Sequence, residues 1–166
     1  MPFALGSTIV ALSTPVTPPA LDLRVTYLAN NGSVPPPYHR ATEIRIDPNG
    51  QGTYLRRHGY DRQDANQRIE LAFSIDIKQL RDLARDLQEL GAFTRRWKEQ
   101  KRPPVGGSVA HLTLTLNDRD TVIPSFPINS QRELAEAVRA QVLALLPEAT
   151  VMARSQWEQA KGASEE

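Results

Sequence analysis

The residues best suited to chemistry in this chain follow a run of three prolines. In the stretch PPPYHR, residues 35–40, Tyr38, His39 and Arg40 place a phenol, an imidazole and a guanidinium side by side. The prolines hold the backbone near polyproline II geometry, so presenting these side chains to a partner costs little conformational entropy. The same prolines lack amide donors and equally suit a stiff connector beside an edge strand. Both interpretations follow from the sequence.

Acid–base chemistry at His39 would need further groups nearby. His58 could supply one, and a metal site from His39, His58 and a carboxylate such as Asp61 is conceivable if the hairpin folds back on the proline loop. One hypothesis is therefore a small hydrolase or transferase built around Tyr38, His39 and His58. The three histidines of the chain lie in separate segments without the spacing of metal ligands, so we expect neither a metal nor a cofactor.

A second candidate region is the basic segment RRWKEQKR, residues 95–102. Its Arg95, Arg96 and Trp97 could hold a phosphate backbone while a base stacks on the indole. However, the formal net charge is only +1, from 20 Lys and Arg against 19 Asp and Glu, and the segment has a single aromatic residue. Nucleic-acid binding is therefore disfavoured. The simpler interpretation is that Trp97 anchors a long loop into the core.

Composition excludes several classes of protein. With 40% hydrophobic and 23% charged residues in 166, the chain has the composition of one soluble domain, and it has no apolar run long enough to cross a membrane. The absence of cysteine excludes disulfides, thiol catalysis and Cys-ligated metals. No phosphate-binding loop, dinucleotide fingerprint, HExxH or GxSxG motif is present. We expect a cytoplasmic protein, or an exported one if the apolar N-terminal segment is a weak signal.

Hydrophobic periodicity predicts the elements that must position these side chains. Alternating apolar residues indicate strands at 21–27, 42–46, 53–58, 69–75, 109–116 and 121–128. Helical spacing indicates one helix after the capping residue Asp76 and a second at 130–146, where Ser130 and Glu133 have the spacing of a capping box.

The order of these elements, ββββαββα, predicts an α+β fold. We expect an antiparallel or mixed sheet of about five to six strands with two amphipathic helices packed on one face. A single domain should span 21–147, between a loosely ordered arm at 1–20 and a tail at 148–166 that is partly helical or disordered.

The function that these observations favour is a noncatalytic binding or interaction module. Long loops carry recognition more often than rigid elements do, and no catalytic motif competes with that interpretation. The candidate contact residues are Tyr38, His39, Arg40, His58, Arg95, Arg96 and Trp97. The expected partner is another protein, with a monomer or a weak homodimer as the oligomeric state; the hydrolase or transferase and weak nucleic-acid binding through 95–102 are the alternatives.

Overall fold

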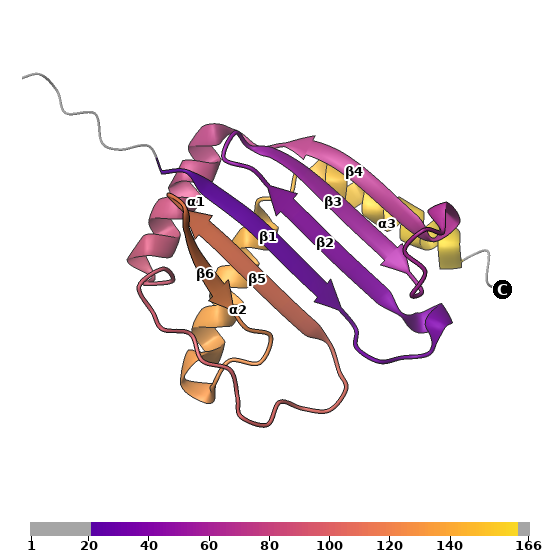
Figure 1. Cartoon of the computed structure of the whole chain (residues 1–166). Coiled ribbons are helices and arrows are strands. Elements are labelled where there is room, and N and C mark those ends of the chain that lie inside the picture. Colours follow the sequence, from indigo (N-terminus) through magenta and orange to yellow (C-terminus); the bar gives the residue numbers. More distant parts are fainter. Residues whose placement is uncertain (1–20, 163–166) are drawn as a thin grey trace, which may run out of the picture.

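The computed structural model describes residues 21–162 as a twisted antiparallel sheet with three helices on one face (Figure 1). The predicted arm at 1–20 and residues 163–166 lie outside the described part. The strands are β1 (Leu23–Asn30), β2 (Arg40–Ile46), β3 (Gln51–His58), β4 (Arg68–Ser74), β5 (Val109–Leu116) and β6 (Arg119–Ile123). Their order in the sheet is β4-β3-β2-β1-β5-β6, and every neighbouring pair is antiparallel. The α+β prediction is confirmed, with a fully antiparallel sheet.

Two short turns fix the register of neighbouring strands. Between β2 and β3 the Asp47 carboxylate accepts hydrogen bonds at 2.9 Å from the amides of Asn49 and Gln51, and it thereby closes the turn. Between β5 and β6, Asn117 and Asp118 adopt φ values of 48° and 62°. Two successive residues in the left-handed region form the type I′ turn, whose twist matches that of the flanking strands.

The sheet separates apolar from polar residues by the alternation of its side chains. One face carries Val25, Ile44 and Leu114, which are at most 1% exposed and belong to a core closed by the helices. The opposite face, here called the open face, carries polar residues such as Thr26 and Arg45, and none of the helices of the described part covers it (Figure 1).

The helices are α1 (Ile77–Glu89), α2 (Asn129–Ala144) and α3 (Glu148–Gly162). Asp76 caps α1 as predicted, because its carboxylate accepts the amide of Lys78 at 2.6 Å. The predicted capping box at Ser130 is wrong: α2 begins at Asn129 after Ile128, and no side chain caps it.

The segment after Pro147 adds a third helix to the two predicted. Only Thr150 of α3 is buried, so α3 packs on the sheet much more loosely than α1 and α2 do. None of the helices within residues 21–162 is both long and apolar enough to cross a membrane.

Candidate functional site

The proline loop is tied to the end of β3 through its histidine. Tyr38 ends a short 3-10 turn and remains 67% exposed, whereas His39 is buried. The Nδ1 of His39 lies 2.9 Å from the carbonyl oxygen of Gly59, which can only accept, so this nitrogen carries the proton. The imidazole also stacks on the ring of Tyr60, with the centroids 4.0 Å apart. His39 therefore joins two loops.

The hairpin folds back on the proline loop, because Arg40 pairs with His58 across β2 and β3. His58 is nevertheless buried against α3, where its ring meets the ring of Trp157 edge-on at 4.6 Å. Tyr38 faces solvent and the two buried histidines have different ring partners, so this geometry offers no support for an acid–base site. No group of three or more His, Asp or Glu side chains that could hold a metal occurs within residues 21–162.

The basic segment at 95–102 is held in place by the buried Gln131 and by main-chain hydrogen bonds of Lys98 and Gln100 to the residues just before α2. The Nε2 of Gln131 donates to the carbonyl of Arg96 at 3.0 Å, and its Oε1 accepts the amide of Lys98 at 2.9 Å. Trp97 packs on the core, and its Nε1 donates to the carbonyl of Ala92 at 2.9 Å, as expected for an anchor. Its ring is therefore engaged by the protein. The side chains of Arg95 and Arg96 are exposed.

A hollow of about 550 Å³ lies on the open face, over β1, β2 and β3. Its floor contains Leu28 and Leu55, which lie on either side of Glu43 in the same row of the sheet. In the adjacent row the small side chain of Ala41 pairs with Arg57 and leaves room above the sheet. The residues that surround this floor with positive charge are Arg45, Arg57, Arg62 and Arg68.

Three of these arginines, Arg57, Arg62 and Arg68, form what is here called the arginine cluster. Arg57 and Arg68 lie directly opposite each other on β3 and β4, a placement that is unfavourable for like charges. None of the three forms an ion pair with any residue in 21–162, whereas Glu43 pairs with Arg45. The Nε of Arg57 is enclosed and has no hydrogen-bond partner there. The cluster thus gathers three guanidiniums without an ion pair, beside a row of the sheet in which Leu28 and Leu55 alternate with Glu43 and Glu70.

No family model matches this chain, and no curated protein matches it either. Function must therefore be inferred from the geometry. Of the residues predicted from sequence, Arg40 and His58 are neighbours in the sheet, while Arg95 to Trp97 belong to a separate loop. Sequence reasoning missed the arginine cluster, because its members come from two strands and a loop and become neighbours only through strand register.

Proposed function

We propose that this protein is a noncatalytic binding module that recognises an acidic polypeptide segment through the open face of its sheet. The observation that carries the proposal is the arginine cluster, whose three guanidiniums form no ion pair with any carboxylate in the described part of the chain. Carboxylates of a partner would pair with these guanidiniums and relieve their mutual repulsion. Hydrogen bonds to charged groups of this kind contribute about 1.5–3 kcal/mol each.

The floor of the hollow favours a polypeptide over a nucleic acid. Leu28, which is 42% exposed, and Leu55 offer an apolar surface between the charged groups. An extended peptide in which acidic and apolar residues alternate would place its apolar side chains on this floor and direct its carboxylates to the rim. Proteins that bind single strands on a sheet stack several bases on aromatic side chains, whereas the outward-facing residues of the six described strands include no Phe, Tyr or Trp and a single imidazole, that of His111 beside Leu28.

The same charge argues against a second copy of the chain as the occupant of the hollow. A two-fold dimer would bring each surface against its own copy, so the two arginine clusters would face each other. Like charges in partly desolvated positions repel, and no carboxylate of the hollow other than Glu43 could compensate. We therefore infer that the protein does not dimerise through its open face.

The test measures binding of a short fluorescein-labelled peptide with alternating glutamate and leucine, by fluorescence anisotropy at low salt. A peptide with lysine in place of glutamate and an oligothymidine of similar length are the comparison ligands. The Arg57→Ala/Arg68→Ala variant removes two members of the cluster, and Arg95→Ala/Arg96→Ala removes the same charge from the basic segment.

We expect the wild-type protein to prefer the glutamate peptide and the Arg57→Ala/Arg68→Ala variant to lose more than about thirtyfold in affinity. The Arg95→Ala/Arg96→Ala variant should bind within about twofold of the wild type, because its arginines lie outside the hollow. Equal losses of affinity in the two variants would show that only the net charge of the protein matters, and they would overturn the proposal. Tighter binding of oligothymidine would support nucleic-acid recognition instead.

A further inference from the structure

A second concave region lies on the opposite, helix-facing side of the sheet. There the side chains of Ala29 and Ala110, paired on β1 and β5, are small and fill little space above the sheet. Helix α2 ends at Ala144 and the chain turns at Pro147 into α3, so α2 does not extend over this end of the sheet. Two hollows of about 370 and 380 Å³ result, and they share Tyr27, Ala29 and Arg56. Together they are called the inner groove.

Tyr27 borders both hollows of the inner groove and has an unsatisfied phenol. Its side chain is only 9% exposed, and its hydroxyl forms no hydrogen bond with any residue in 21–162. Tyr54 lies two strands away in the same row of the sheet and lines one of the two hollows together with Tyr27. The hydroxyl is not fully enclosed but opens onto the groove, so a ligand there could accept its hydrogen bond.

Burial raises the pKa of Tyr27, which keeps the phenol protonated at neutral pH. The hydroxyl is therefore a donor that would suit an anionic oxygen. The other charged groups around the Tyr27 hydroxyl are mostly arginines, which also favour an anion.

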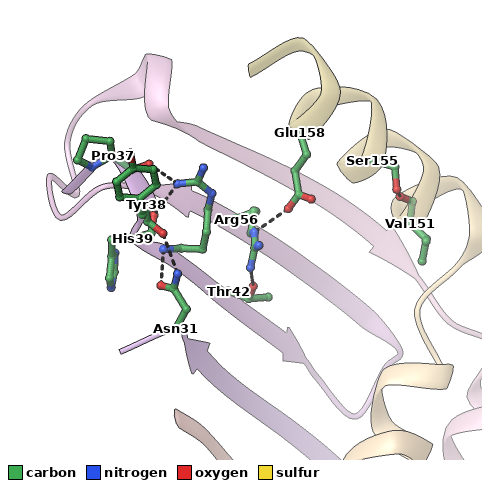
Figure 2. A network of polar contacts seen from close by, with 10 residues as sticks. Asn31, Pro37, Tyr38, His39, Thr42, Arg56, Val151, Ser155 and Glu158 are labelled. Carbon is green, nitrogen blue, oxygen red and sulfur yellow. Dashed lines mark hydrogen bonds and ion pairs between the residues drawn. The ribbon is translucent and has the colours of Figure 1, made fainter. Parts of the chain in front are cut away.

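The inner groove is lined by three arginines and one carboxylate. Arg56 is held on both sides, by Glu158 at 2.9 Å from its Nε and by the hydroxyl of Thr42 at 2.6 Å (Figure 2). The guanidinium of Arg40 donates to two main-chain carbonyls, those of Pro37 at 2.6 Å and His39 at 3.1 Å, and forms no ion pair within residues 21–162. Arg154 lines the same groove beside Glu158. Positive charge thus exceeds negative charge around the unpaired phenol.

We infer that the inner groove binds a small organic anion with an apolar body. Its carboxylate or phosphate would accept hydrogen bonds from the Tyr27 hydroxyl and from the arginines that line the groove. Its apolar part would contact Leu143 and Leu146 at the end of α2, which line the same hollow. The inner groove and the arginine cluster lie on opposite faces of the sheet, although Ala29 lines hollows on both faces, and the inference does not depend on the function proposed for the open face.

In the test, the full chain is titrated with benzoate, phenyl phosphate and uncharged benzamide. Isothermal titration calorimetry measures the affinity of each ligand, and backbone amide shifts in NMR show where it binds. Tyr27→Phe removes only the unpaired hydroxyl, and Tyr38→Phe is the matched control, because Tyr38 is exposed outside the groove. Ala29→Leu fills the floor that the two hollows share.

We expect one or both anions to bind and to shift the amides of Tyr27, Ala29 and Arg56, while benzamide binds at least tenfold more weakly. Comparison of benzoate with phenyl phosphate identifies the preferred anion. Tyr27→Phe should weaken binding about five- to tenfold, the effect of one hydrogen bond, and Tyr38→Phe should leave it unchanged. The Arg57→Ala/Arg68→Ala variant should bind the anion like the wild type.

Three results would overturn the inference. The first is that neither anion binds in the millimolar range. The second is that Tyr27→Phe binds the anion as tightly as the wild type does, and the third is that the shifted amides lie outside the inner groove. Ala29→Leu provides an independent check, because it should abolish binding without removing a polar group. If that variant does not fold, Tyr27→Phe still decides the question, since it keeps the ring and its packing.

Discussion

The basic segment at 95–102 and the arginine cluster of the open face concentrate similar charge in different ways. The first is contiguous in sequence, yet its Arg95 and Arg96 are exposed and its Trp97 is committed to the core. The second is dispersed in sequence, yet Arg57 and Arg68 are paired across two strands beside an apolar hollow. A run of charged residues is most often a solvated surface, whereas charge gathered by the fold at a concave surface is a better indication of a binding site.

Reversal of charge in the arginine cluster should have the largest effect. If its charge selects the partner, the Arg57→Glu/Arg68→Glu variant should lose the glutamate–leucine peptide and bind the lysine–leucine peptide more tightly by more than about tenfold. Anisotropy titrations with both peptides measure this exchange. The same reversal at Arg95 and Arg96 is the control. An exchange of preference in the control as well would remove the distinction between the two regions.

Replacement of Gln131 should have an intermediate effect. It concerns the basic segment at 95–102, and it is an effect on the stability of the protein. Gln131→Ala leaves the carbonyl of Arg96 and the amide of Lys98 without their partners, and Gln131 is only 7% exposed. We expect the free energy of unfolding to fall by about 1–3 kcal/mol, measured by urea denaturation. Peptide binding at the open face should be unchanged in the folded protein. A stability equal to that of the wild type would show that Gln131 does not hold the basic segment.

The smallest effect should come from replacing one charge of the cross-strand pair. Arg68→Glu converts a like-charge pair with Arg57 into an opposite-charge pair, which should raise the free energy of unfolding by about 0.5 kcal/mol. The same change at exposed Arg95 is the control and should have less effect. Urea denaturation at low salt measures both. A loss of stability on Arg68→Glu would contradict the prediction that repulsion between Arg57 and Arg68 dominates at this position.

Much of the fold could be predicted from the sequence, because alternation and capping are local signals. The strand around Val25 and the Asp76 cap of α1 depend on residues close together in the chain. Helix α3 was only partly anticipated, since a helix that buries little more than Thr150 has a weak apolar pattern. The predicted start of α2 at Ser130 was wrong because the helix has no side-chain cap at all.

The candidate sites depend on register, which periodicity does not specify. Nothing local places Arg57 opposite Arg68, or Tyr27 two strands away from Tyr54. A shift of one residue in either pairing would move these side chains to the other face of the sheet. The arginine cluster and the inner groove were therefore not predictable from one sequence.

The most direct test of the proposed function is NMR mapping of the glutamate–leucine peptide on the wild-type protein. We predict that the amides of Leu28, Ala41, Leu55 and Arg57 shift on binding while those of residues 95–102 do not. The shifts should be absent in the Arg57→Ala/Arg68→Ala variant. Shifts confined to residues 95–102, or no shifts at saturating peptide, would contradict the claim that the open face is the binding surface.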